Sequence, residues 1–247
     1  MRIFISLLLV TAGGVWDFPG PVYGHTPQEK AFYLQSRIVL HLNPRDTVAG
    51  NAVGVWHLEY NEVDEAARAF ASVLAVDPRN QTAGMGKALI DEHRGNFAGA
   101  LTKLDAISGD RKGLGPFLKV VRARLLFRLK KYREAERELT NNIPGKALPH
   151  DLNFWMGRIR EETSRPLDAI AYYYKAIEAD PFWPEPYSRL SVLHQEQGNH
   201  QQARKVLADM LHLRNPSPYP NNDIGILWGW VMRSDRTQSA AAENPGK

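Results

Sequence analysis

Adjacent acidic residues are the first groups in this sequence whose types could support catalysis. Asp91-Glu92 and Glu161-Glu162 each place two carboxylates side by side, and two carboxylates can divide the work of a general acid and a general base. Both pairs lie in segments with helical patterning, where neighbouring side chains point to different sides of the helix. We therefore expect neither pair to act on one substrate, and we predict no catalytic residues.

The sequence also lacks the motifs of metal-binding and phosphate-binding sites. The eight histidines are scattered, and no H-E-x-x-H pair occurs, so we predict no metal ligands. No G-x-x-x-x-G-K-[ST] phosphate loop and no G-x-S-x-G nucleophile turn is present. The glycine-rich stretch "GDRKGLGP", residues 109–116, precedes no strand and is interpreted as a loop. The absence of cysteine excludes disulfides and thiolate sites. We predict no cofactor and no enzymatic activity.

The composition is that of an ordinary globular protein. Of the 247 residues, 43% are apolar and 23% are charged, so a sizeable core can be built. The net charge of +4 is too small to indicate a nucleic-acid partner, and we predict none.

A repeated spacing organises most of the chain. Five segments contain alanine followed four residues later by a large side chain, and the alanines are spaced 34, 35, 34 and 34 residues apart. These pairs are Ala66/Phe70, Ala100/Leu104, Ala135/Leu139, Ala169/Tyr173 and Ala203/Leu207. Twelve residues before each alanine stands another small or short residue: Gly54, Ala88, Ala123, Gly157 and Ser191.

This spacing predicts units of two helices joined by a short turn. The small residue of the first helix and the alanine of the second allow close approach, and the large residue, on the alanine's face, fills the groove beside it. Asp77-Pro78 and Asp180-Pro181 are predicted to end second helices, because the residue before proline disfavours helical geometry. Gly95-Asn96 and Gly198-Asn199 are predicted to form turns inside units.

The period and its residues resemble the tetratricopeptide repeat family, whose pattern is W-x2-L-G-x2-Y…A-x3-F…P. All five units meet the second half of the pattern, while Lys87 and Arg122 depart from the first half, where an apolar residue is expected. His57 and His194 occupy the family's tyrosine position, which favours packing or surface roles over metal binding. The resemblance implies an all-α solenoid with units at residues 47–80, 81–115, 116–149, 150–183 and 184–216.

The two ends of the chain carry further signals. Residues 1–14 combine Arg2, a short apolar run and small residues, which predicts a signal peptide cut between positions 13 and 24. Residues 15–25 are interpreted as an extended arm and residues 26–44 as an N-terminal capping helix. The expected localisation is periplasmic or otherwise exported; an uncleaved N-terminus would instead anchor the protein to a membrane.

The C-terminal region is apolar nearly all round. Residues 217–234 are predicted to hold a helix with Trp228 and Trp230, followed by a mobile tail over residues 235–247. Two interpretations stay open. The helix caps the end of the solenoid, or it forms an interface with a partner, a second copy or a membrane surface.

Binding is expected on the inner face of the solenoid, which the first helix of each unit lines in the family. By that resemblance the groove residues are Asn51, Val55, Met85, Leu89, Arg124, Arg128, Phe154, Arg158, Ser188 and Val192. Arg124 and Arg128 carry like charges four residues apart, which predicts a counter-charge. Either Glu161 or Glu162 of the next unit supplies it, or an acidic partner segment does.

The stretch "EADPFWPEPYSRL" adds two aromatic residues to the candidates. Proline accounts for the break between the fourth and fifth units, but Phe182 and Trp183 are unusual in such a turn. They either pack between units, which we favour, or mark an exposed contact site. The sequence thus indicates an exported scaffold or adaptor that binds a protein or peptide in an envelope assembly, secretion or polysaccharide-export complex. The alternative is a substrate-presenting accessory subunit of an enzyme complex.

Overall fold

The computed structural model describes residues 27–108, 116–140, 151–213, 227–228 and 231–232, and these contain helices but no strand. The signal-like start, the arm, Trp230, the loop over residues 109–115 and the tail lie outside the described residues. The helices are α1 (Pro27–Leu42), α2 (Thr47–Glu59), α3 (Val63–Val76), α4 (Gln81–His93), α5 (Phe97–Ser108), α6 (Pro116–Arg128), α7 (Tyr132–Thr140), α8 (Asp151–Glu162), α9 (Pro166–Ala179), α10 (Pro184–Glu196) and α11 (His200–Leu211).

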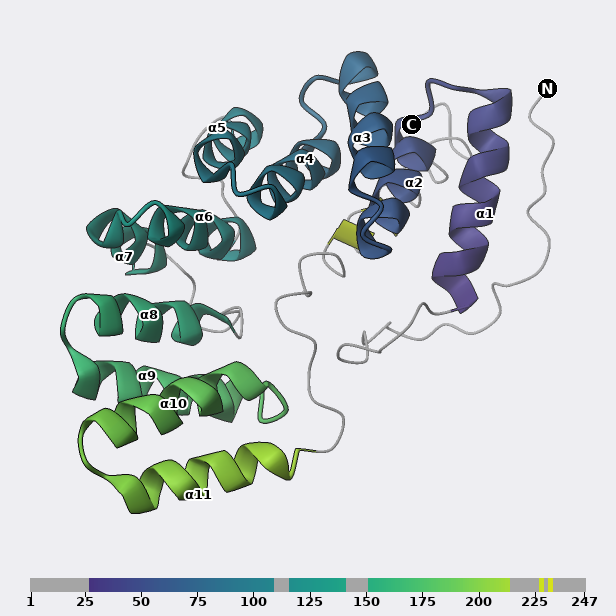
Figure 1. Cartoon of the computed structure of the whole chain (residues 1–247). Helices are drawn as coiled ribbons and strands as arrows, with labels where there is room; N and C mark the ends of the chain where they lie inside the picture. Colours follow the sequence, from purple (N-terminus) through teal and green to yellow (C-terminus); the bar gives the residue numbers. More distant parts are fainter. Residues whose placement is uncertain (1–26, 109–115, 141–150, 214–226, 229–230, 233–247) are drawn as a thin grey trace, which may run out of the picture.

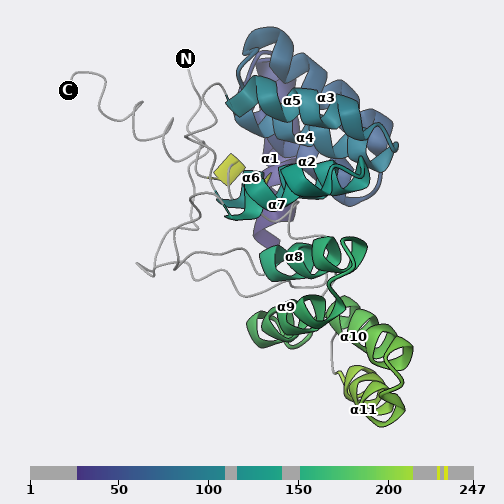
Figure 2. The same ribbon diagram turned by 90° about the vertical axis from the view of Figure 1, so that its left-hand side faces the viewer.

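The helices stack as antiparallel pairs along a curved array (Figures 1 and 2). The pairs α2–α3, α4–α5, α6–α7, α8–α9 and α10–α11 form the five units, and α1 packs against α2 ahead of the first. Each second helix also contacts the first helix of the following unit, which links neighbouring pairs into one solenoid. The prediction of an all-α solenoid of helix pairs is confirmed.

Glycine residues, which have no side chain, explain why the paired helices approach so closely. A β-carbon at Gly54 would lie 2.5 Å from the Phe70 ring, and one at Gly157 would lie 2.6 Å from the Tyr173 ring. Both rings are fully buried. The large residue of the second helix therefore covers the glycine of the first, and its ring, not the alanine, is the nearest neighbour of that glycine.

The turn inside every unit has the same backbone shape. A residue with positive φ occupies one equivalent position in all five units: Asn61, Gly95, Lys130, Ser164 and Gly198. Their φ angles lie between 59° and 75°. The two glycines adopt this left-handed conformation without penalty, as predicted for Gly95 and Gly198, while the other three residues have a β-carbon that opposes it.

The ends of the helices follow the polar and proline signals of the sequence. Asp46 and Asn80 cap α2 and α4 by accepting from the backbone N–H groups of Ala49 and Ala83, at 2.9 and 3.0 Å. Asp77 and Asp180, the residues before Pro78 and Pro181, have extended backbones and end α3 and α9 as predicted. Proline begins α10, where the missing N–H has no cost.

Two apolar clusters form the core, and α6 belongs to both. Leu118, Val121 and Leu125 join the first cluster, with α2 to α5. Val120, Leu126 and Phe127 join the second, with α7 to α11. A helix buried on opposite sides explains why residues 120–127 are buried without interruption.

Arg122 departs from the repeat pattern, yet the structure accommodates it as a buried cation between helices. Its side chain is 7% exposed and pairs with Asp105 of α5 and, at 2.7 Å, with Glu138 of α7. Because a buried charge is tolerated when it is paired and hydrogen-bonded, the second and third units keep the common geometry.

Candidate partner-binding surface

The inner face of the curved array is formed by the first helices of the units, α2, α4, α6, α8 and α10, with the second helices behind them (Figure 1). The predicted groove residues all lie on these five helices. They do not form one open groove, because their exposure differs sharply between the two halves of the solenoid.

The predicted positions in the first two units are covered. Val55 and Met85 are 0% exposed, Asn51 is 3% exposed, and Leu89 is partly buried against the same cluster. The Asn51 side-chain amide donates to the side-chain carbonyl oxygen of Asn80, the N-cap residue of α4, at 2.9 Å. The expectation that Val55, Met85 and Asn51 face a free groove is wrong, because other parts of the chain already fill the space around them.

Part of that covering is the C-terminal segment, of which residues 227–228 and 231–232 are described and helical. Leu227, Trp228 and Val231 are 0%, 2% and 0% exposed and belong to the first apolar cluster, together with α2, α4 and α6. The Trp228 indole N–H donates to a Glu59 carboxylate oxygen at 2.9 Å. In Figure 1 this segment lies inside the arc beside α2 and α3, away from α11, the helix that precedes it in the chain.

The interface interpretation stays a prediction for Trp230, which lies outside the described residues. The described part of the segment does not cap the fifth unit, because Leu227, Trp228 and Val231 belong to the apolar cluster of the first three units. It crosses back to the first three units, because an apolar segment without a polar face is buried most fully in an apolar concavity. Its uniform apolarity was the signal for burial, but nothing in the sequence indicated where.

Arg124 is withdrawn from the groove by an ion pair. Its side chain is 4% exposed, and two of its guanidinium nitrogens, Nε and Nη2, donate to the two Glu92 carboxylate oxygens at 2.8 and 2.7 Å. The predicted counter-charge on Glu161 or Glu162 is wrong, because the carboxylate comes from the preceding unit. Arg128, four residues on, is exposed.

Phe182 and Trp183, between the fourth and fifth units, differ in their environment. Trp183 is fully buried, with its ring centroid 4.6 Å from that of Phe154, which is itself 4% exposed. Phe182 is 51% exposed. Packing between units is confirmed for Trp183, while Phe154 is a core residue and not a groove residue.

A shared carboxylate organises the inner face of α8 and α10. Glu161 accepts from the Tyr173 hydroxyl at 2.6 Å and from Arg189 Nε at 3.1 Å, and Arg158 Nε lies 3.9 Å from it. Arg158 also lies over the Phe127 ring, 5.1 Å from its centroid. Two arginines thus share the Glu161 carboxylate.

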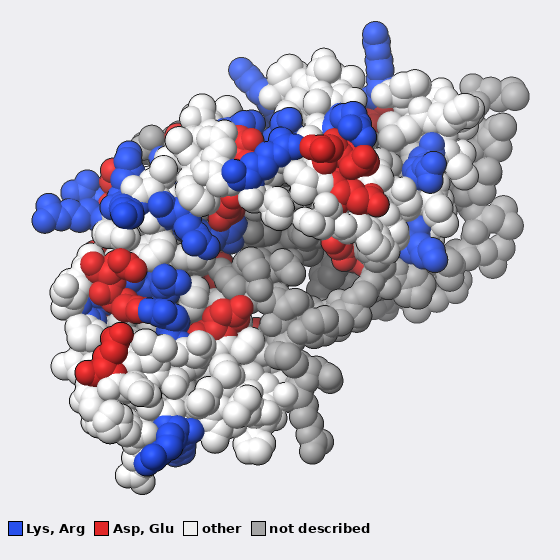
Figure 3. All heavy atoms as spheres, in the orientation of Figure 1, with Lys and Arg blue, Asp and Glu red and all other residues white. Residues whose placement is uncertain are grey.

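The titration of these groups follows from burial. Burial raises the pKa of the Tyr173 hydroxyl, which stays protonated and remains a donor to Glu161. Burial, and then the positive charge of Arg158, lower the pKa of Arg189. Figure 3 shows acidic and basic side chains next to each other over these units, as expected when most charges are paired.

The open part of the inner face lies beyond this network. Ser188 is exposed, Val192 is 40% exposed, and Arg158 has a side chain that is 25% exposed. Together with Arg128 they are the predicted groove residues that solvent reaches readily. They present two cations, one hydroxyl and one apolar side chain.

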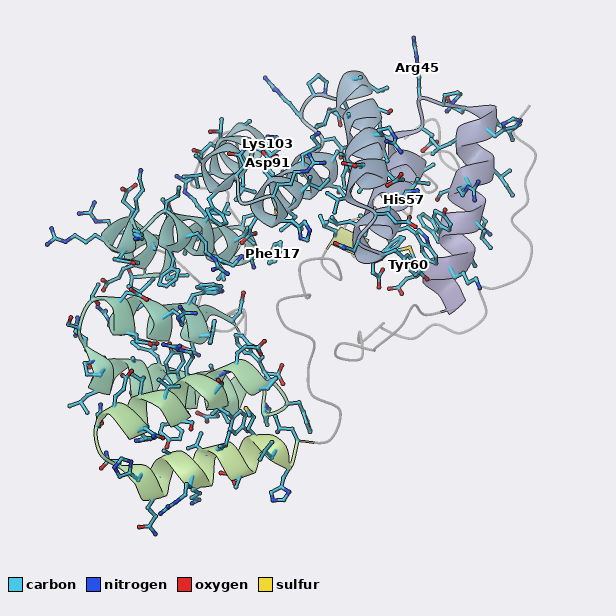
Figure 4. All side chains as sticks on the ribbon, viewed as in Figure 1. Arg45, His57, Tyr60, Asp91, Lys103 and Phe117 are labelled. Atoms are coloured by element: carbon cyan, nitrogen blue, oxygen red, sulfur yellow. The ribbon has the colours of Figure 1, made fainter. Side chains whose placement is uncertain are left out.

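His57 and His194, the two histidines at the family's tyrosine position, have structural partners. His57 Nδ1 lies 2.5 Å from Glu62, and its ring meets the Tyr33 ring edge-on, 6.1 Å between centroids. Figure 4 shows His57 and Tyr60 beside α1, where Tyr33 stacks on Trp56. His194 is 8% exposed, with Nε2 3.3 Å from the Tyr174 hydroxyl.

Two absences hold within the described part of the chain. No group of three or more potential ligands is placed to hold a metal ion there. Among the described helices, none is both long enough and apolar enough to cross a membrane.

Comparisons with known proteins agree with this geometry. The family model described as tetratricopeptide repeat matches residues 57–112 and 120–184. No curated protein matches the sequence significantly.

Solved structures with a similar fold include MamA and YrrB, the latter titled a TPR protein with an unusual peptide-binding site. MamA is 19% identical with a TM-score of 0.53, covering 67% of this chain and 90% of its own. YrrB is 14% identical with a TM-score of 0.52, covering 81% and 97%. Cut9, from the Cut9–Hcn1 complex of the APC/C, is 16% identical with a TM-score of 0.66, covering 89% and 44%. With five in-phase helix pairs and the family model matched over most of them, the chain belongs to the tetratricopeptide repeat family.

Proposed function

We propose that this protein is a non-catalytic scaffold that binds a segment of a partner protein on the inner face of its third to fifth units. The observation that carries the proposal is that Arg128, Ser188 and Val192 are exposed and Arg158 is partly exposed on first helices, beside the Glu161 carboxylate that Arg158 and Arg189 share. Stacked helix pairs offer an extended concave surface of the kind that binds peptides and partner domains.

The chemistry of this face selects the partner. Arg158 and Arg189 share the single Glu161 carboxylate, so an additional carboxylate from a partner would complete their pairing. Val192 offers an apolar contact of about one side chain. The partner segment therefore carries acidic residues with an apolar residue close by.

The cellular setting is part of the same proposal. The charged start, the apolar run and the small residues of positions 1–14 support export, and hence a complex of the cell envelope, such as one for assembly, secretion or polysaccharide export. Mass spectrometry of the protein from its native host measures the N-terminus directly. Recovery of the intact Met1 terminus in the envelope would argue against cleavage.

Affinity purification tests the binding face. The protein is cross-linked and purified from its native host, and the partners captured by the wild-type chain are compared with those of a variant carrying Arg128→Glu and Val192→Asp. Both residues are exposed, so the fold is retained. Partner capture is expected to fall at least tenfold.

The matched control carries Arg204→Glu and Leu207→Asp. Both positions are exposed and lie on α11, the second helix of the fifth unit. It makes the same two chemical changes away from the inner face, and capture is expected to be unchanged. Equal loss in both variants would contradict the proposed face, and so would equal retention.

A further inference from the structure

The inner face of the first three units already holds a peptide-like ligand, which is the protein's own C-terminal segment. Leu227 and Val231 are four residues apart, each is helical, and both are fully buried. Trp228 is 2% exposed and donates its indole N–H to Glu59, 169 residues away in the chain. The contact is thus made between parts of the chain that are distant in sequence.

The receiving surface has the composition of a binding site for an apolar helix. Val55 of α2, Met85 of α4 and Leu125 of α6 are all 0% exposed and belong to the same apolar cluster as the segment. Glu59, at the end of α2, provides one acceptor. An apolar site that also offers a directed polar group fixes both the position and the orientation of its ligand.

We propose that the inner face of α2, α4 and α6 is a second binding site, which accepts a short apolar helix bearing tryptophan from a partner protein, and that the C-terminal segment occupies it as an internal competitor. The partner's helix has the chemistry of the present occupant: two aliphatic side chains four residues apart and an indole N–H that reaches Glu59. Its apolar lining differs from the charged face of the third to fifth units, although α6 contributes to both, and it does not rest on the function proposed for that face.

Tethering decides how the two ligands compete. A segment held on the same chain experiences an effective concentration of about 1 mM. If the free segment binds with a Kd of about 10 μM, the tether weakens the apparent affinity of an outside helix about 100-fold. The wild-type site is therefore closed to weak ligands and opens only when the internal segment is weakened or outcompeted.

A labelled peptide tests this directly. The peptide spans residues 223–233, and its binding to the full-length chain is followed by fluorescence anisotropy. The wild-type chain is expected to bind it weakly. Trp228→Ala in the chain removes the buried ring from the internal segment while leaving the α2, α4 and α6 surface intact, so the peptide is expected to bind at least tenfold more tightly.

Two further variants make the result specific. A peptide in which the tryptophan equivalent to Trp228 is replaced by alanine is expected to lose most of its binding to the Trp228→Ala chain. Phe182→Ala removes an exposed aromatic residue elsewhere and is expected to bind the peptide as weakly as the wild-type chain does. Circular dichroism verifies that each chain keeps its helices.

Trp228→Phe covers the case in which the alanine variant loses its fold. It keeps an aromatic ring in the core but removes the N–H that donates to Glu59, together with part of the buried ring. The peptide is expected to bind this chain more tightly than the wild-type chain.

The outcomes separate the hypotheses. Equal binding to the wild-type and weakened chains, or none to either folded variant, would overturn the proposal. A wild-type dimer that Trp228→Ala converts to a monomer would overturn it too, because the segment would then serve self-association. Since the probe is the protein's own sequence, the result does not depend on whether the Arg128 and Val192 variant loses its partner.

Discussion

Replacing Gly54 by alanine tests how tightly the helix pairs of this solenoid are packed. A β-carbon at this position would lie 2.5 to 2.8 Å from three atoms of the Phe70 ring. Gly86 of the next unit lies against the other edge of the same ring, where a β-carbon would also be too close. The ring is fully buried between the two glycines and has no space into which to withdraw.

Two opposing effects set the size of the change. Alanine in a helix interior is favoured over glycine by about 1 kcal/mol, which would stabilise an exposed site. Overpacking a close-packed core costs about 1 to 3 kcal/mol, since the neighbours must move off their preferred rotamers. Because Phe70 is held from both sides, we expect overpacking to prevail and the free energy of unfolding to fall by about 1 to 2 kcal/mol.

The assay is a double-mutant cycle in urea, followed by circular dichroism. Phe70→Leu alone leaves a cavity and is expected to destabilise the protein. In that background there is room for the new methyl group, so Gly54→Ala is expected to be neutral or stabilising. The sign of the alanine effect should therefore reverse with the size of residue 70. If Gly54→Ala stabilises the otherwise wild-type chain, the close contact inferred from the glycine geometry is refuted.

Three further perturbations have expected outcomes. Arg124→Met leaves the Glu92 carboxylate unpaired and should lower the free energy of unfolding, measured in urea, by about 3 kcal/mol. The control Arg68→Met breaks an exposed ion pair and should lower it by less than about 1 kcal/mol. Similar losses in the two variants would contradict the assignment of Arg124 and Glu92 as a buried pair. Ser164→Gly relieves a left-handed backbone and should raise the melting temperature; a fall would show that the serine side chain matters more than its φ of 59°. Burial raises the pKa of Glu185, so the folded chain holds that proton more tightly than the unfolded chain. The wild type therefore loses stability as the pH rises from the ordinary glutamate pKa through the raised pKa of the folded state. Glu185→Gln should therefore be more stable than the wild type at pH 7, with the gain disappearing at pH 3 in urea titrations, and a pH-independent difference would contradict this.

The repeat period predicted most of the fold because each unit is specified locally. Gly54 with Phe70, and Asp77 before Pro78, act within or just beyond one helix pair. A contact that recurs every 34 residues is visible five times in one sequence. The left-handed turn was visible only at Gly95 and Gly198, since Lys130 and Ser164 are not residues that signal positive φ.

The candidate site was predicted less well, because it depends on contacts between units that do not recur. Glu92 and Glu161 are both acidic residues near the end of a first helix. Glu92 pairs with Arg124 of the unit that follows it. Glu161 pairs with Arg189 of the unit that follows it, but it also accepts a hydrogen bond from Tyr173 of its own unit. Ion pairs between stacked helices depend on the rotation from one unit to the next, which a periodic pattern does not encode.

The sequence by itself determined the helix pairs, their turns and their stacking into a solenoid, because these follow from residue sizes and backbone preferences repeated at a fixed period. Only the tertiary structure decided which part of the inner face is open. The C-terminal segment reaches the first three units across the arc, and a single contact such as that of Trp228 with Glu59 has no periodic signature. An apolar segment must be buried somewhere, but the shape of the folded array determines the place.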